Sequence, residues 1–406
     1  MKKTKIIYII LALFILASCQ NNKDKNGKDE NKTVENDNNS NKGEVFMSSD
    51  YYPINILERE TKKKKGENLL VSPYSINEAL LLLAKGAEGE SLKEIEKLLG
   101  GDVDTISNRA KNIGEKIQKN IDENKDYYEI DPSFKSLNSI WIKNNFSVKE
   151  DYLKESSGEV FKEPFDKSTL EKINSWVSEG TNGKIDKMLD DLDEELRMLL
   201  INTLYFNDEW QKKYTKDDIQ KLIFKAKEEK ECDFLVSSEK YYLENDDFKG
   251  FKKEYLSGAN FIGLMAKEGK IEDKLGLLSR EKISEFISKS REDADLTVKI
   301  PKFDFEYKGD LKEIFENMGI ENIFSNEADF SKISDEKLKV SDIIHKTFIS
   351  FNETGTEAGA ATLIGMEMMS APAQREMIEL VFDRPFLFFI EYDGEILFMG
   401  IVNDIK

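Results

Sequence analysis

The sequence has few of the residues on which most catalytic and metal sites depend. It contains one histidine, His345, and two cysteines in 406 residues. A single histidine excludes a paired-histidine metal site and the H-E-x-x-H motif of zinc proteases. A Ser-His-Asp triad would have to use His345, which lies between two apolar segments with no nucleophile elbow nearby. The composition therefore gives no support for an enzyme, and we expect neither a metal nor another cofactor.

Long apolar runs are also missing, except at the N-terminus. Three lysines precede the apolar run Ile6–Leu16, and Ala17-Ser18-Cys19 follows it. This order is typical of a secretory signal, and the run is too short to cross a bilayer as a helix. The cysteine makes the segment similar to a bacterial lipoprotein signal, in which cleavage after residue 18 leaves Cys19 as a lipid-modified N-terminus. The alternative is an ordinary signal peptide (1–18) with an incidental cysteine.

Residues 19–48 are dominated by Asn, Lys, Asp, Glu, Gly and Ser, and such a segment cannot bury enough apolar surface to fold. We interpret it as a disordered tether that holds a domain at 49–406 away from a membrane. Removing the three lysines of residues 1–18 changes the formal charge from −19 to −22. So acidic a protein is a poor candidate for binding nucleic acid. Only Cys232 then remains as a free thiol, which excludes an internal disulfide, and we expect a monomer.

Apolar periodicity predicts a mixed α+β domain, with helices in the first half and most strands in the second. Helical spacing is clear at 75–83 and 91–99. Strand-like stretches lie at 139–142, 198–206, 260–265, 296–300, 347–351, 379–381, 387–391 and 396–402.

Several separate motifs resemble those of the serpin family and occur in the same order as in that family. They are NLLVSPYS (68–75), INSWVSEGTNGKI (173–185), NTLYFNDEW (202–210), IPKFDFEY, LKEIFENMGIENIFS and ADFSKIS between 300 and 334, His345-Lys346, ETGTEAGAAT (353–362), DRPFLFFI (383–390) and ILFMG (396–400). The resemblance covers essentially all of residues 50–406. It implies the serpin fold, with three β-sheets, about eight or nine helices and an exposed reactive loop near the C-terminus.

The resemblance also implies a mechanism. Serpins are mostly suicide inhibitors of serine or cysteine proteases, which cut the reactive loop and are trapped as acyl-enzymes while the upstream part of the loop inserts into the central sheet as a new strand. By the family pattern, the hinge of the loop comprises Glu353, Gly355, Thr356, Glu357, Ala358, Gly359, Ala360 and Ala361. The residue before the scissile bond falls sixteen positions after Glu353, which gives Met369–Ser370. Met368–Met369 and Arg375–Glu376 remain as alternatives.

The loop sequence itself is compatible with insertion. Residues 353–371 contain no proline, which would be excluded because a strand inside a sheet must donate its backbone N–H groups. Side chains alternate between faces of a strand. The set that begins with Thr356 has no charge as far as Met368, whereas Glu357 and Glu367 both fall on the other face. The first face is therefore suited to burial.

The resemblance assigns further residues to regions that control the opening of the sheet. Ser72, Ser75, Asn202 and His345 would form a polar shutter cluster beneath the central strands, and Trp210 would lie at the top, in the breach, where insertion begins. For His345, an ordinary satisfied core histidine is nearly the same interpretation. Cys232 is most simply a structural or surface cysteine.

These observations predict an inhibitory serpin anchored by lipid on the outer face of a bacterial membrane, exposed to the extracellular or periplasmic side. The apolar, unbranched Met369 suits target proteases of elastase-, chymotrypsin- or subtilisin-like specificity. Two alternatives remain. One is a non-inhibitory serpin acting as a surface binding or chaperone-like protein. The other is a lipid-anchored solute receptor or hydrolase, for which the sequence displays no site.

Overall fold

The computed structural model describes residues 51–156, 159–356 and 375–405, which contain eight α-helices, four short 3-10 helices and sixteen strands. Within these ranges, no helix is long and apolar enough to cross a membrane. The strands form three separate sheets, of six, four and six strands. The expected α+β class with three sheets is confirmed.

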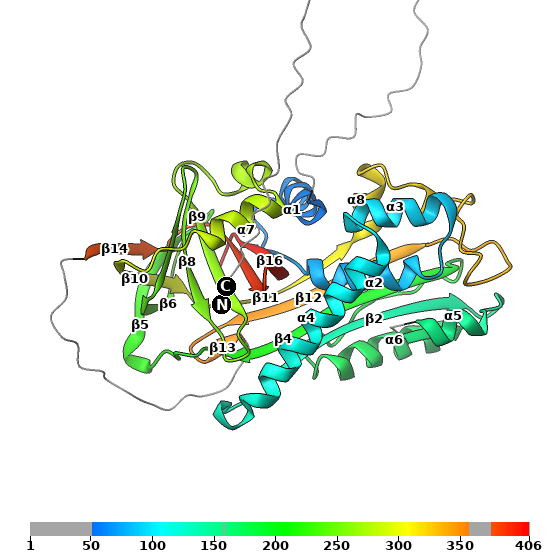
Figure 1. The fold of residues 1–406 in the computed structure, drawn as a ribbon, viewed down its shortest axis with the longest axis horizontal. Helices are drawn as coiled ribbons and strands as arrows, with labels where there is room; N and C mark the ends of the chain where they lie inside the picture. The colour runs from blue at the N-terminus through cyan, green and yellow to red at the C-terminus, as the bar shows by residue number, and fades with distance from the viewer. Residues whose placement is uncertain (1–50, 157–158, 357–374, 406) are drawn as a thin grey trace, which may run out of the picture. The chain divides into compact units, whose positions relative to one another are not determined.

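The central sheet has the strand order β11-β12-β13-β4-β2-β3. Its longest members are β4 (Met198–Glu209), β2 (Ser133–Lys143) and β12 (Asp342–Phe351), which run side by side across Figure 1. The remaining members are β3 (Glu159–Glu163), β11 (Phe303–Asp310) and β13, which comprises only Gly355–Thr356. β2 and β4 are antiparallel partners over ten registered pairs, from Ser133–Asn207 to Ile142–Met198. These two strands therefore form a firmly joined unit.

The other two sheets contain most of the C-terminal half of the chain. The second six-stranded sheet has the order β1-β16-β15-β9-β8-β7 and is almost wholly buried. Its strands are β1 (Leu69–Val71), β7 (Tyr241–Glu244), β8 (Phe248–Glu254), β9 (Asn260–Ala266), β15 (Phe386–Tyr392) and β16 (Glu395–Val402). The four-stranded sheet has the order β14-β10-β6-β5 and comprises β5 (Ile219–Lys225), β6 (Glu229–Glu239), β10 (Ala294–Pro301) and β14 (Glu376–Val381).

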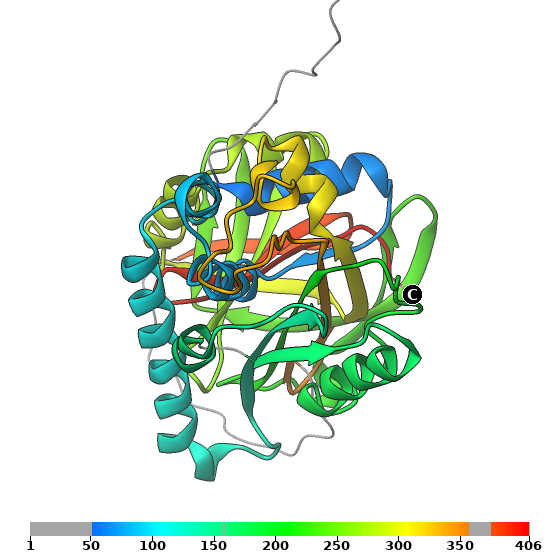
Figure 2. The same ribbon diagram turned by 90° about the vertical axis from the view of Figure 1, so that its right-hand side faces the viewer.

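Helices cover both faces of the central sheet (Figures 1 and 2). α2 (Pro73–Ala84) packs on one face against β2 and β4, and α6 (Lys167–Gly180) packs on the other. Even-numbered residues of β4 such as Leu200 and Phe206 enter the main core, whereas Leu199 and Ile201 enter a smaller core beneath α6. The other helices are α1 (Tyr52–Lys63), α3 (Gly89–Leu99), α4 (Val103–Glu123), α5 (Glu150–Glu155), α7 (Arg280–Ser288), α8 (Leu311–Asn317), η1 (Lys125–Tyr127), η2 (Lys216–Asp218), η3 (Glu272–Leu277) and η4 (Asn322–Phe324).

Capping explains where several helices begin. The side chain of Ser72 accepts a hydrogen bond from the backbone N–H of Ser75, and Pro73 follows at the first helical position of α2. Asp102 and Asp166 cap α4 and α6 in the same way, and hydrogen bonds from their helix termini hold the pKa of each aspartate below its ordinary value. α2 is thereby fixed with its N-terminus directly beneath the central sheet.

Candidate functional site

The central sheet is only partly closed between β4 and β12. These strands pair in parallel from Asp342–Leu199 to His345–Asn202, and no registered pair joins 346–350 to 203–207. We call these two facing stretches the seam. At its far end, β13 lies between the two strands and is antiparallel to both, with Thr356 opposite Phe351 on one side and Asp208 on the other. The start of the hinge therefore already occupies the entrance to the seam.

Glycine is required at position 355 by the close approach of the neighbouring strand. A Cβ atom built on Gly355 would lie 1.9 Å from the backbone oxygen of Asp208 and 2.8 Å from the Cα of Glu209. Neither atom belongs to a flexible side chain, so no side chain can be accommodated without separating β13 from β4. The small size of this residue is what lets the hinge enter the sheet.

Aromatic residues hold the hinge in place. The indole N–H of Trp210 donates to the backbone oxygen of Asn352 at 3.0 Å. The backbone N–H of Trp210 donates to the backbone oxygen of Thr354 at 2.9 Å. The ring of Trp210 stacks on Tyr255 with centroids 4.2 Å apart. The hydroxyl of Tyr255 in turn lies 2.5 Å from the hydroxyl oxygen of the buried Thr356. Trp210 thus lies at the entrance to the seam.

Charged groups surround the same entrance. Lys302 bridges Glu353 at 2.9 Å and Asp233 at 3.3 Å. Partial burial acts to lower the pKa of Lys302, but its hydrogen bonds to the carboxylates of Glu353 and Asp233 outweigh burial, and the pKa is raised. Asp208 is fully buried opposite Thr356, and burial raises its pKa to about 7 although Ser257 and Tyr128 donate hydrogen bonds to it. The strand next to the hinge therefore carries a buried carboxyl group whose ionisation destabilises the folded state.

The shutter residues named from the sequence lie together where the seam begins. The backbone N–H of Ser72 donates to Nε2 of His345 at 3.1 Å, and Nδ1 of His345 lies 2.6 Å from the side-chain oxygen of Asn202. The side-chain amide of Asn202 donates to two oxygens of Ser75, its backbone oxygen and its hydroxyl oxygen. Burial lowers the pKa of His345 to about 3, so the imidazole is neutral at ordinary pH. The cluster joins α2 to the last registered pair of β4 and β12.

Three contributors to this site were missed from the sequence. Asn138 of β2 accepts a short hydrogen bond from Asn202, and Glu78 of α2 accepts one from Asn138. Tyr255 contacts Thr356 across 101 positions of the chain. The spacing of Ser72, Ser75 and Glu78, three residues apart on one helix, was an available signal for Glu78. No local pattern indicated the other two.

Several residues predicted for the site lie outside the described residues. They are Cys19, Glu357, Ala358, Gly359, Ala360, Ala361, Met368, Met369 and Ser370. Arg375 is described. Its guanidinium lies 3.9 Å from Asp295, and Glu376 directly after it begins β14 and pairs with Arg291. Cys232 is a free, partly buried cysteine of β6, and burial raises the pKa of its thiol.

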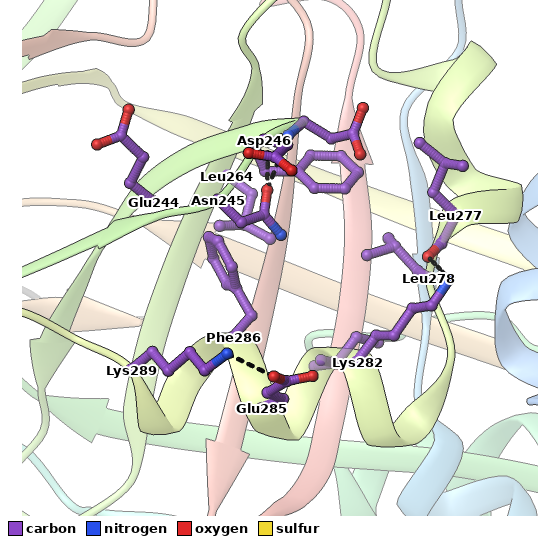
Figure 3. A pocket seen from close by; sticks show the side chains of 13 residues that line it. Glu244, Asn245, Asp246, Leu264, Leu277, Leu278, Lys282, Glu285, Phe286 and Lys289 are labelled. Atoms are coloured by element: carbon purple, nitrogen blue, oxygen red, sulfur yellow. Dashed lines mark hydrogen bonds and ion pairs between the residues drawn. The ribbon is translucent and has the colours of Figure 1, made fainter.

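Pockets elsewhere in the described residues offer little for chemistry. One of about 270 Å³ lies between α7 and the turn joining β7 to β8 (Figure 3). Its two lysines are engaged within the protein: Lys289 pairs with Glu285 at 2.5 Å, and Lys282 donates to the backbone oxygen of Leu277 at 3.0 Å. His345, the single histidine of the chain, is buried in the shutter cluster and cannot act as a base on an external substrate.

Fold and site together define a class of protein with three sheets. In this class, the loop that precedes the C-terminal strands begins inside the central sheet, here as β13. The chain matches the family model described as "Serpin (serine protease inhibitor)" over residues 50–405. It therefore belongs to the serpin family, as the sequence motifs indicated. Members of this family are mostly inhibitors rather than catalysts.

Relatives and solved structures agree with this assignment. An uncharacterized serpin-like protein of Thermococcus kodakarensis is 32% identical over 347 residues, 82% of this chain and 80% of the relative. A serine protease inhibitor of Cyanea capillata is 31% identical over 356 residues, 82% and 91% of the two chains. The crystal structure of the thermophilic serpin tengpin in its native state is similar with a TM-score of 0.75 at 29% identity, covering 92% of this chain and 96% of that one.

Proposed function

We propose that this protein is an inhibitory serpin that traps serine proteases by inserting its cleaved reactive loop into the seam. The observation that carries the proposal is the position of Gly355 and Thr356, already hydrogen-bonded between β4 and β12. A strand that continues from them meets two strands whose facing edges are not registered with each other. Such edges present free backbone groups that a new strand can satisfy.

The observed register defines how the loop would insert. Thr356 lies opposite Asp208 and Phe351, so each later residue of the loop falls opposite an earlier residue of both strands. Thr356 is buried, and side chains alternate between faces. Residues with the parity of Thr356 would therefore enter the main core, and among them Ile364 falls opposite Leu200 and Ile343. The two glutamates of the loop, Glu357 and Glu367, take the other face, as the proposal requires.

The same register supports cleavage near Met369. Met366 falls opposite Met198, the first residue of β4, so insertion from Thr356 to Met366 would fill the whole length of that strand. A protease attached at Met369 would then be carried to the far end of the sheet with three residues of connection. Attachment at Arg375 would leave a much longer connection, and its scissile bond adjoins the paired strand β14. We therefore propose Met369–Ser370 as the reactive bond.

Incubation with elastase-, chymotrypsin- and subtilisin-like proteases tests the proposal. We expect a covalent complex that resists denaturation, together with a released C-terminal fragment whose mass places the cleaved bond after Met369. A protein that is only cleaved, without any complex, would favour the non-inhibitory alternative. A Thr356→Arg variant is the matched control, because a charged side chain at this buried position should block insertion and leave cleavage intact.

We further propose that the protein is a lipoprotein displayed outside the cell, joined to the membrane through Cys19 and the tether at 19–48. The charged, apolar and small-residue order of the first 19 residues supports this proposal. An outward-facing inhibitor would act on proteases in the surroundings or on the cell's own secreted proteases.

A further inference from the structure

Glu78 ends a directional chain of hydrogen bonds that crosses the central sheet. The chain starts at the backbone N–H of Ser72, which can only donate, so Nε2 of His345 accepts. Nδ1 of His345 therefore carries the proton and donates to Asn202 at 2.6 Å. Asn202 donates to Asn138, and Asn138 donates to Oε2 of Glu78 at 3.3 Å. The donor and acceptor of each hydrogen bond are thus fixed by the bond before it. Oε2 of Glu78, the last group, must accept.

The two ends of this chain lie on one helix, whereas the middle lies on moving parts of the sheet. Ser72 is the N-cap of α2 and Glu78 lies in the middle of that helix, while Asn138 and Asn202 are registered partners on β2 and β4. Opening the seam separates β4 from β12, and the long β2–β4 pairing means that these two strands move together. Movement of that unit over α2 must break the bond between Asn138 and Glu78.

The surroundings of Glu78 leave its carboxylate without a cation. Within the described part of the chain, no lysine or arginine lies at ion-pair distance from it. Burial raises the pKa of Glu78, and hydrogen bonds from Ser136, Tyr74 and Asn138 oppose part of that rise. The other titratable groups of the chain and its neighbours are His345, which stays neutral, and Tyr74, whose pKa is raised by burial. Burial raises the pKa of Asp208, at the other end of the seam, to about 7.

We propose that Glu78 is a positioning residue of the shutter, whose ionised carboxylate anchors the hydrogen-bond chain and keeps β4 and β12 paired from Asp342–Leu199 to His345–Asn202, beside the seam. A hydrogen bond to a charged acceptor is about twice as strong as one to a neutral acceptor. Neutralising Glu78 therefore weakens the bond that must break when β2 and β4 move. The inference rests on the proposed insertion mechanism for its biological meaning, but the opening of the seam can be measured without a protease.

Hydrogen–deuterium exchange of the full chain tests the proposal. In a Glu78→Gln variant at pH 8, we expect peptides covering 199–202 and 342–345, where β4 and β12 are paired, to exchange on the order of fivefold faster than in the wild type. Peptides from β15 and β16, which report on global unfolding, should be unchanged. The ratio of variant to wild-type exchange should approach one as the pH falls through the raised pKa of Glu78. Taking this ratio cancels the contribution of Asp208, which titrates in both proteins.

The urea unfolding midpoint separates the proposal from a purely structural role, in which Glu78→Gln would lower that midpoint. Because the pKa of Glu78 is raised in the folded state, its contribution to stability against unfolding is fully present at low pH and is lost as the pH rises through that pKa. Glu78→Gln should therefore keep or raise the urea unfolding midpoint at pH 8 while loosening the seam. Equal exchange of variant and wild type at 199–202 and 342–345, or faster exchange spread over β15 and β16, would overturn the proposal.

A matched control and a separate readout complete the test. Glu90→Gln places the same change on an exposed position of α3 and should alter neither exchange nor unfolding. Failure of the wild type to trap any protease would count against the proposed function, whereas the exchange data would still decide the role of Glu78.

Discussion

Replacing Gly355 by alanine should block the first step of insertion. The added Cβ would lie 1.9 Å from the backbone oxygen of Asp208, far inside van der Waals contact. β4 cannot retreat, because β2 pairs with it at Asn207 and Tyr128 holds the side chain of Asp208 at 2.8 Å. The hinge must therefore leave the sheet.

Leaving the sheet breaks three hydrogen bonds. They join Tyr255 to Thr356, Trp210 to Thr354 and Asn352 to Gly355. At a net ~0.5–1.5 kcal/mol each, their loss costs about 3 kcal/mol, which corresponds to a roughly hundredfold slower insertion. A protease released before insertion escapes, so most of the variant should be consumed as substrate.

The assay is rapid-quench electrophoresis with a protease that the wild type traps, scoring covalent complex against cleaved inhibitor. Gly101→Ala is the matched control, because a Cβ atom at that position, between α3 and α4, would meet nothing closer than the side chain of Ile106 at 3.5 Å. The reasoning is refuted if Gly355→Ala forms complex as rapidly and completely as the wild type.

Three other predictions follow from the same site and from the N-terminus. Asp208→Asn should raise the free energy of unfolding at pH 8.5 by ~1–3 kcal/mol and have a smaller effect at pH 5, because the stability contribution of a group with a raised pKa is lost progressively as the pH rises from its ordinary value to about 7; urea titrations at both pH values check this. Lys302→Met and Glu353→Gln should each loosen the hinge, with a coupling energy of about 1 kcal/mol in a double-mutant cycle, and independent additive effects would contradict the ion pair. Cys19→Ala should move the protein from the membrane fraction to the soluble fraction on ultracentrifugation, and retention in the membrane would exclude lipid anchoring through this cysteine.

Much of the fold could be predicted from short segments of the sequence. The strands at 198–206, 260–265 and 396–402 were identified because each is a buried, apolar stretch, and the structure extends each by at most three residues. α4 was not identified, although Ala110, Ile113, Ile117 and Ile121 have helical spacing and are buried. Its many charged residues hid that pattern.

The details of the site could not be predicted in the same way. The contact of Tyr255 with Thr356 joins positions 101 residues apart, and the half-closed pairing of β4 with β12 depends on a third strand between them. Glu78 appeared to be one more acid in a chain with 79 of them, and only the hydrogen bond from Asn138 distinguishes it. Such roles arise from long-range packing, which short-range periodicity does not record.

The place where β4 and β12 separate divides insertion into two energetic stages. If the register of Thr356 continues, residues 357–361 would fall opposite the unregistered stretch 203–207 and would add backbone hydrogen bonds without breaking any between the two strands. Thr362 is the first that falls opposite Asn202 and His345, where continued entry must separate a registered pair. We therefore expect an early downhill stage followed by a barrier at the shutter. The point of no return for a trapped protease would then lie six residues after Thr356, well before the strand is complete.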